Sequence, residues 1–442
     1  MHVGSSWPLV DAVQLIVSAI RKESSMKNHD TTLWTPSPHP EWLQAMNQEG
    51  GYLDLAAVVP LDENSLLHHA RQTTGLQDFG DDLWRQPFTV LIRSLEQEAE
   101  LTLMGRIMAR SDIILWLSTR LQVTDTLKKN PEILDEEITA PTVIVGLPRS
   151  GTSILFELLS QDSDVGVPLM WEALQPCPPP DAATYHIDPR IEKAHQIFTQ
   201  WNRVAPEFSS MHEMRGDIPA ECGLLMASTF ISDHCAALHQ THSYSAFCAD
   251  VDYFPVYQYH KKILQILQWK NPRKRWLLKS PEHQVHLDTL LRVYPDAHIV
   301  QTHRDPIKCM ASSTSLIGTL YYMRSDQPFN AQLFADVIMG DATAKRLEYV
   351  IDQRKSGAVP EENIVDSRYQ DLMDNPIECI EKIYTYFGLT LTDDTRSRME
   401  KYLRDKPRGK FGQHSYEIDE CKALDRDLFR PYQALYNVPD EV

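Results

Sequence analysis

Apolar and polar positions follow two different rhythms along the chain, and the change between them divides the sequence. Residues 81–120 repeat apolar side chains at helical spacing, and an earlier helix begins near Asp62 or Ser65, either of which can cap it. After residue 140, short apolar runs that suit strands alternate with helical patterns. Strands are expected at 141–146, 276–278, 297–302 and 363–366, and helices at 252–268, 284–293, 305–322, 331–354 and 375–387.

This alternation predicts an α/β fold, with a P-loop-like parallel sheet flanked by helices. We expect residues 1–138 to form a helical N-terminal extension and residues 139–442 to form the α/β domain. The apolar stretch at 7–20 is interrupted by Asp11, Gln14 and Ser18, so it predicts an amphipathic helix rather than a membrane span. A weak or uncleaved signal is the alternative interpretation of that stretch.

Composition narrows the choice of partners. The chain has 442 residues, of which 42% are hydrophobic, and its net charge of −18 disfavours a nucleic-acid partner. Its seven cysteines are scattered and form no Cys-x-x-Cys pair, which indicates reduced thiols in a cytoplasmic protein. We therefore expect no nucleic acid and no integral membrane segment. The oligomeric state stays open, and a homo-oligomer is compatible with the sequence.

The stretch 142–153, Thr-Val-Ile-Val-Gly-Leu-Pro-Arg-Ser-Gly-Thr-Ser, is an apolar strand that turns tightly into a helix. Such a turn directs backbone N–H groups and a helix dipole at an anion, usually a phosphate. The glycine spacing resembles that of the ATP-binding loop, but Thr152 stands where that loop has its lysine. A phosphate-bearing ligand, held by Arg149, Ser150, Gly151, Thr152 and Ser153, is predicted, and a chance turn is the alternative.

Three cations follow the predicted strands at the points where these end. Arg149 follows the first strand, Lys279 the second and Arg304 the third. Ligands of parallel sheets bind beyond the carboxyl ends of the strands, so we expect the three side chains to converge. Ser312 lies eight residues after Arg304, about two helical turns, so a guanidinium and a hydroxyl could share one phosphate.

The motifs together resemble a known family. Pro148-Arg-Ser-Gly-Thr152, followed by Arg304-Asp-Pro306 and Ser312, resembles the sulfotransferase superfamily, which uses 3′-phosphoadenosine 5′-phosphosulfate. The resemblance is closer to the bacterial-type branch that acts on small or lipophilic alcohols, and it covers about residues 140–420. It also rests on Met170-Trp-Glu172, Pro219-Ala-Glu-Cys222, the stretch 276–283, Tyr369-Gln-Asp-Leu372 and Gly412-Gln-His-Ser-Tyr416.

The resemblance implies a sulfotransferase that moves a sulfuryl group from this donor to the hydroxyl of a small or lipophilic alcohol or phenol. It places the 5′-phosphosulfate in the first motif and the 3′-phosphate on Arg304 and Ser312. Tyr369 is expected near the adenine, and Arg408 and Lys410 near the 3′-phosphate. The product would be 3′-phosphoadenosine 5′-phosphate. No metal is required, because a sulfuryl group carries less charge than a phosphoryl group.

Sulfuryl transfer needs a base, because a neutral alcohol is a poor nucleophile. The resemblance to tyrosylprotein sulfotransferases implies that Glu172 is the base. The cytosolic branch instead has a histidine shortly after a lysine, and this resemblance implies His283 as the base. Both alternatives stay open. Lys279 and Arg149 are expected to neutralise the leaving phosphate. Two other classes of function also stay open, a P-loop nucleotide-dependent kinase and a non-catalytic sulfotransferase-like binding protein.

Overall fold

The computed structural model describes residues 35–327, 340–406 and 426–441. A group of helices precedes the first strand. Asp62 caps one of them by accepting a hydrogen bond from the Ser65 backbone N at 2.9 Å, so Asp62 is the capping residue. The predicted amphipathic helix at 7–20 lies outside the described residues. The N-terminal helices are α2 (Glu41–Gly50), α3 (Leu55–Val58), α4 (Glu63–Thr74), α5 (Arg85–Gln97) and α6 (Leu103–Lys129).

Five parallel strands form one sheet in the order β2-β3-β1-β4-β5. The strand β1 is central, and all of its residues are buried. The predicted α/β class is confirmed, and each predicted strand has its counterpart. The additional strand β2 is only two residues long, too short to leave a pattern in the sequence. The strands are β1 (Thr142–Gly146), β2 (Val165–Gly166), β3 (Arg275–Lys279), β4 (His298–His303) and β5 (Ile364–Arg368).

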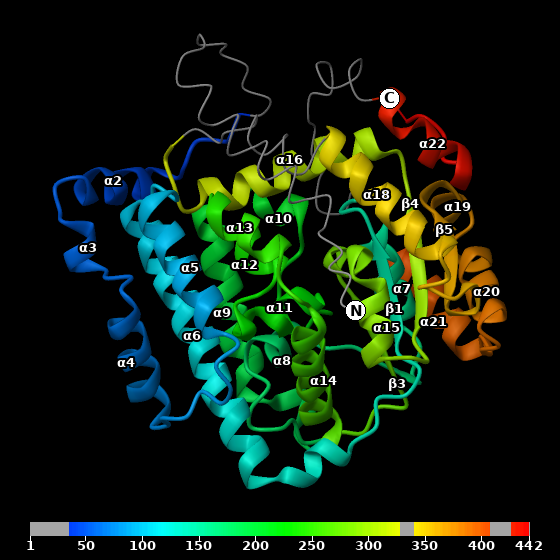
Figure 1. Cartoon of the computed structure of the whole chain (residues 1–442), viewed down its shortest axis with the longest axis horizontal. Coiled ribbons are helices and arrows are strands. Elements are labelled where there is room, and N and C mark those ends of the chain that lie inside the picture. The colour runs from blue at the N-terminus through cyan, green and yellow to red at the C-terminus, as the bar shows by residue number, and fades with distance from the viewer. Residues whose placement is uncertain (1–34, 328–339, 407–425, 442) are drawn as a thin grey trace, which may run out of the picture.

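Helices flank the sheet, which stands on the right in Figure 1, with α19 to α21 on its outer side. The predicted helices are present within one to three residues of their expected ends, except that only residues from 340 onward of the helix predicted at 331–354 are described. The flanking helices are α7 (Thr152–Leu159), α15 (Leu287–Val293), α16 (Pro306–Tyr322), α18 (Gly340–Lys355), α19 (Tyr369–Asp374), α20 (Pro376–Tyr386) and α21 (Asp393–Asp405).

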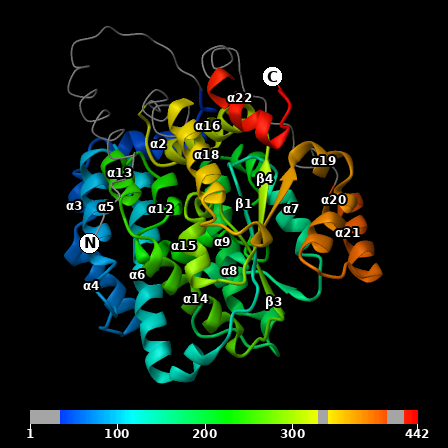
Figure 2. The same ribbon diagram turned by 45° about the vertical axis from the view of Figure 1, so that its right-hand side comes forward.

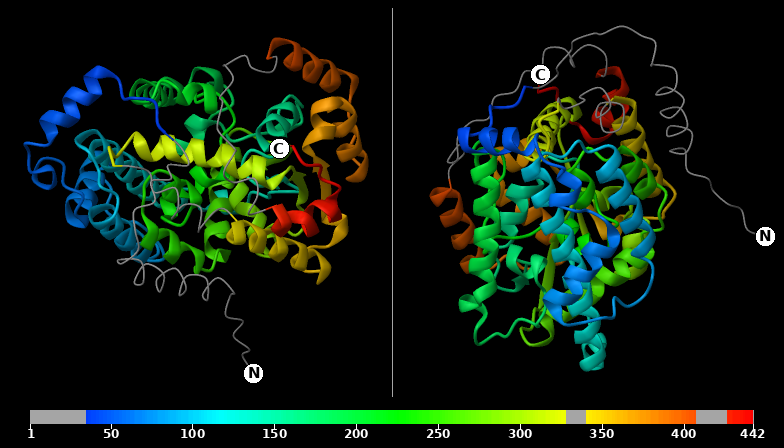
Figure 3. Two further views of the ribbon diagram at one scale, coloured as in Figure 1. Left: turned by 90° about the horizontal axis from the view of Figure 1, so that it is seen from above. Right: turned by 90° about the vertical axis from the view of Figure 1, so that its left-hand side faces the viewer.

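A long helical insertion separates β2 from β3 and lies between the sheet and the N-terminal helices (Figures 1 and 3). One apolar cluster joins Leu91 and Leu117 of the N-terminal helices with Phe230 and Tyr244 of the insertion. The two regions therefore share a core, and the domain boundary at 138/139 stays a prediction. The insertion contains α8 (Met170–Leu174), α9 (Pro189–Val204), α10 (Phe208–Met211), α11 (Cys222–Met226), α12 (Asp233–Ala237), α13 (His242–Ala249) and α14 (Phe254–Trp269).

The helix α22 (Arg426–Tyr436) lies above β4, near the start of α16 (Figure 2). Its Phe429 and Tyr432 belong to one apolar cluster with Leu147 and Ile307. This packing brings the segment that follows α22 close to the carboxyl ends of the strands.

Two further properties concern the described ranges as a whole. No helix found there is both long enough and apolar enough to cross a bilayer. The six cysteines within these ranges are buried and form no disulfide, and Cys421 lies outside them.

Candidate active site

The loop between β1 and α7 is fixed by close contacts with β4. A Cβ on Gly146 would lie 2.2 Å from Thr302 Oγ1, so only glycine allows this approach. Ser150 Oγ donates to the Leu147 carbonyl at 2.6 Å and lies 2.6 Å from Thr302 Oγ1. Gly151 has a φ of 97° and precedes the first turn of α7. The loop therefore presents the N-terminus of α7 at the carboxyl edge of the sheet.

Two of the predicted cations meet at this loop. Arg149 has a φ of 68°, and its Nε donates to Ser312 Oγ at 3.0 Å. Arg304 Nη1 donates to the Arg149 carbonyl at 2.9 Å. Arg149 therefore lies between Arg304 and Ser312, and the structure brings the three residues together. Their roles in binding a donor stay predictions.

The third cation, Lys279, reaches the loop from the end of β3. Its Nζ lies 3.3 Å from Ser153 Oγ in the first turn of α7, and its side chain is only 3% exposed. Arg149 thus belongs to the loop, Arg304 contacts its backbone, and Lys279 contacts the first turn of the helix that follows it.

The predicted adenine neighbour, Tyr369, lies under Arg304. Its ring centroid is 3.8 Å from the guanidinium carbon, and a Cβ on Gly151 would lie 2.9 Å from the same ring. Tyr369 therefore contacts both the loop and the arginine motif, a position from which it can support the guanidinium by stacking. The remaining predicted cofactor residues, Arg408 and Lys410, lie outside the described residues, as does the segment 412–416.

Glu172, one of the two predicted bases, is completely buried at the start of α8. One carboxylate oxygen accepts from the Leu169 backbone N at 2.8 Å, and the other lies 3.2 Å from Arg273 Nη2. Burial raises the pKa of Glu172, against the opposing effect of Arg273. These contacts cap the start of α8 and pair with a partly buried arginine, and neither partner is a predicted site residue. A base role for Glu172 stays a prediction.

His283, the rival base, is also completely buried. Its Nδ1 lies 2.8 Å from the Tyr257 hydroxyl, and burial lowers the pKa of the imidazole well below its ordinary value. The neutral ring could accept a proton only at considerable cost, because the interior disfavours its charged form. The role predicted for His283 likewise stays untested.

The neighbouring Glu282 is buried beside Asp233, which raises the pKa of its carboxyl and gives a pH-dependent prediction. Its buried carboxyl accepts from Asp233 N at 3.0 Å and contacts the Tyr253 hydroxyl at 2.9 Å. Burial, with the nearby Asp233 charge, raises the pKa of Glu282 from 4.5 to about 8. Because the folded-state pKa is the higher one, stability from this group is complete below pH 4.5 and is lost as pH rises toward about 8.

We expect Glu282→Gln to flatten this loss, since an amide has no proton to lose in that range. The measurement is the free energy of unfolding in urea at several pH values between 4.5 and 8, with the exposed Glu378→Gln as the matched control. An identical pH slope in wild type and Glu282→Gln would contradict the prediction.

Glu221 is a candidate that the sequence motifs did not single out by role. It immediately precedes α11, forms an ion pair with Lys279, and lies 3.9 Å from His212 Nε2. Although burial raises the pKa of Glu221, Lys279 and His212 outweigh this effect and hold the pKa below its ordinary value. Its side chain is 33% exposed and pairs with the lysine at the end of β3. In the sequence, Glu221 belongs to the segment 219–222, which resembles a family motif but has no function assigned to it.

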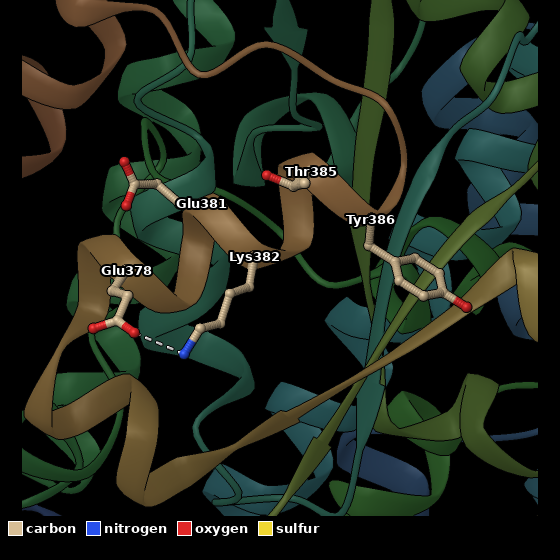
Figure 4. A pocket seen from close by; sticks show the side chains of 5 residues that line it. All are labelled: Glu378, Glu381, Lys382, Thr385 and Tyr386. Carbon is tan, nitrogen blue, oxygen red and sulfur yellow. Dashed lines mark ion pairs between the residues drawn. The ribbon is translucent and has the colours of Figure 1, made fainter.

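A surface hollow of about 340 Å³ lies apart from this site, and we do not consider it a candidate active site. Its lining residues Glu378, Glu381, Lys382, Thr385 and Tyr386 all come from α20, and an ion pair joins Glu378 to Lys382 at 2.8 Å (Figure 4). It includes none of the predicted site residues. Among the described residues, no group of three or more His, Cys, Asp or Glu side chains is arranged to hold a metal ion.

The comparisons with known proteins show the family of the chain. A model of the sulfotransferase family matches residues 141–393, which is more than half of the chain. The chain therefore belongs to the sulfotransferase family. This match confirms the predicted membership and the enzyme class, and it covers the loop, Lys279, Arg304 and Ser312.

Several mycobacterial proteins are similar to this chain. The omega-hydroxy-beta-dihydromenaquinone-9 sulfotransferase Stf3 of Mycobacterium bovis is 23% identical over 309 residues, which cover 64% of this chain and 72% of Stf3. The structure of sulfotransferase STF1 from Mycobacterium tuberculosis matches with 30% identity and a TM-score of 0.73, covering 84% of this chain and 98% of STF1. STF9 from Mycobacterium avium matches with 27% identity and a TM-score of 0.74, covering 86% and 98%.

Proposed function

We propose that this enzyme transfers a sulfuryl group from 3′-phosphoadenosine 5′-phosphosulfate to the hydroxyl of a lipophilic alcohol or phenol. The observation that carries the proposal is that Arg149 lies in the β1–α7 loop, Arg304 contacts that loop and Lys279 contacts the first turn of α7, where hydroxyl groups also lie. Such a group of hydrogen-bond donors and positive charges suits a ligand that has phosphate groups at two places. In this proposal, residues 149–153 hold the 5′-phosphosulfate, and Arg304 with Ser312 holds the 3′-phosphate.

Lys279 and Arg149 would stabilise the charge that develops on the leaving phosphate. Glu221 is the carboxylate nearest to Lys279, and we propose it as the base that takes the proton of the acceptor hydroxyl. In the unliganded arrangement Lys279 pairs with Glu221 and keeps its pKa low. When Lys279 instead faces a donor anion, Glu221 loses part of this stabilisation and becomes a better proton acceptor. Glu172 and His283 remain the alternatives.

The acceptor is proposed to be at least partly apolar. Stf3, a relative of this chain, acts by its name on a menaquinone derivative with a terminal hydroxyl. In this chain, Arg149 Nη1 donates to the carbonyl of Met211 at 3.2 Å. Met211 is buried and lies on α10 with the buried Phe208, whose ring is next to that of Trp201. Apolar side chains thus lie directly beside the loop where the reaction would occur.

The test combines binding and turnover. We expect 3′-phosphoadenosine 5′-phosphate to raise the melting temperature, and donor labelled in the sulfuryl group to give labelled product with hydroxylated lipids or aryl alcohols. A shift with ATP–Mg²⁺ but none with the bisphosphate would overturn the proposal in favour of a kinase. Binding of the bisphosphate without transfer to any acceptor of the panel would favour a non-catalytic binding protein.

Lys279→Met gives a sharper test of the proposed site. Removing one preorganised charge donor typically lowers kcat by about 10²–10³-fold, and methionine keeps most of the buried stem. We expect a loss of that size, whereas Lys274→Met, which removes an exposed lysine paired with Asp164, should leave kcat unchanged. The measurement is kcat with saturating donor and acceptor, and equal kcat for wild type and Lys279→Met would exclude a role in catalysis.

A further inference from the structure

The guanidinium of Arg304 already has an anionic partner within this chain. Arg304 Nε lies 2.8 Å and 3.1 Å from the two carboxylate oxygens of Glu441, and Nη2 lies 2.7 Å from one of them. Both side chains are mostly buried. A carboxylate held in this way occupies the Nε–Nη2 edge of the guanidinium, whose two N–H groups could otherwise donate to two phosphate oxygens.

Glu441 is also held through its backbone and through the residue before it. Its backbone N donates to Asp305 at 2.8 Å, in the same motif as Arg304. Arg426 of α22 joins Asp305, at 2.9 Å, to Asp440, at 3.0 Å. The segment 437–441, which we call the strap, is therefore bound to the arginine motif through both backbone and side chains.

The helix before the strap is bound to the same motif. Tyr432 places its hydroxyl 2.8 Å from Nδ1 of His303, the residue that precedes Arg304, and Tyr436 stacks on the His303 ring at 4.0 Å. The buried Phe429 packs in the cluster that contains Ile307 and Met310. The helix α22 is therefore held against the arginine motif by contacts that do not involve the strap.

We propose that Glu441 is an internal competitor for the 3′-phosphate of the donor, so that the strap leaves Arg304 when donor binds and returns when product departs. This inference rests on the proposed function, because it assumes that Arg304 holds the 3′-phosphate. One guanidinium edge cannot pair with a carboxylate and a phosphate at once. A phosphate has more charge and more acceptor oxygens than a carboxylate, so it can displace Glu441, but part of its binding energy is spent on doing so.

The competition predicts a selective effect on nucleotides that carry a 3′-phosphate. Glu441→Gln keeps the shape of the side chain but removes its charge. We expect it to tighten the binding of 3′-phosphoadenosine 5′-phosphate by about tenfold, the value that follows from the low end for a hydrogen bond to a charged group. The affinity for adenosine 5′-diphosphate, which has no 3′-phosphate, should stay unchanged. Asp427→Asn removes an equal charge from an exposed position on α22 and should change neither affinity.

The experiment is isothermal titration of wild type, Glu441→Gln and Asp427→Asn with both nucleotides. Equal affinity of wild type and Glu441→Gln for the bisphosphate would overturn the competition, and so would an equal gain for both nucleotides. A wild-type chain that binds neither nucleotide would instead overturn the proposed function. As a second measurement, amide hydrogen exchange in the strap should speed up when the bisphosphate is added to wild type, and an unchanged rate would also contradict the proposal.

Discussion

Glu221→Gln is expected to lower kcat/KM for sulfuryl transfer by about 10²–10⁴-fold, the usual contribution of a general base. The amide can still accept a hydrogen bond from Lys279, so the loop should keep its arrangement, but it cannot take a proton from the acceptor. The affinity for 3′-phosphoadenosine 5′-phosphate should fall little or rise, because Lys279 no longer has to leave an anionic partner. Steady-state kinetics and titration of the bisphosphate measure the two effects separately.

Asp217→Asn is the matched control for Glu221→Gln. Asp217 lies in the same connecting segment, is exposed, and pairs with Arg215 at 2.6 Å. The loss of one negative charge near the site should by itself leave kcat/KM within a few-fold of wild type. If Glu221→Gln retained full activity while Glu172→Gln or His283→Gln lost it, the base would be one of the residues that the sequence motifs favoured.

Glu172→Ala is expected to act on folding instead of on the reaction. Removing one partner of a buried ion pair leaves the other charge without compensation, which typically costs about 3–5 kcal/mol of the free energy of unfolding. Arg273 would be that charge, and the Leu169 backbone N would lose its acceptor as well. The loss is measured by urea denaturation of wild type and mutant.

A second variant separates stability from catalysis at this position. Glu172→Gln keeps an acceptor for the Leu169 backbone N, so its stability loss should be smaller than that of Glu172→Ala, and its folded fraction should retain near-wild-type kcat. A drop in kcat of the size expected for a base, with stability intact, would show that Glu172 does act on the acceptor.

The positions of the three cations at one edge of the sheet could be predicted from the sequence, because the ends of strands are local features. Arg149, Lys279 and Arg304 each follow an apolar run directly, and parallel strands must bring such residues to one edge. The tight approach at Gly146 was likewise visible as a glycine between a strand and a helix. These features depend on backbone geometry, which short patterns specify well.

The partners of those cations could not be predicted in the same way. Glu221 precedes Lys279 by 58 residues, and Glu441 follows Arg304 by 137, so neither pairing leaves a spacing that a motif could reveal. The resemblance implies Glu172 as the base, yet its position in the first turn of a short helix directs its carboxylate toward the Leu169 backbone N. Both carboxylate oxygens of Glu172 therefore have partners, one in the helix cap and one in Arg273, that short sequence patterns do not reveal.

The apolar cluster that joins the N-terminal helices to the insertion has a consequence for engineering. Consider a chimaera that takes only the insertion from a relative. In that chimaera, the insertion would pack against N-terminal helices from a different protein. Side chains of the insertion that fit the helices of the relative would then leave voids or clashes against α5 and α6 of this chain. Exchange of the insertion among these enzymes would therefore have to transplant both helical regions as one piece.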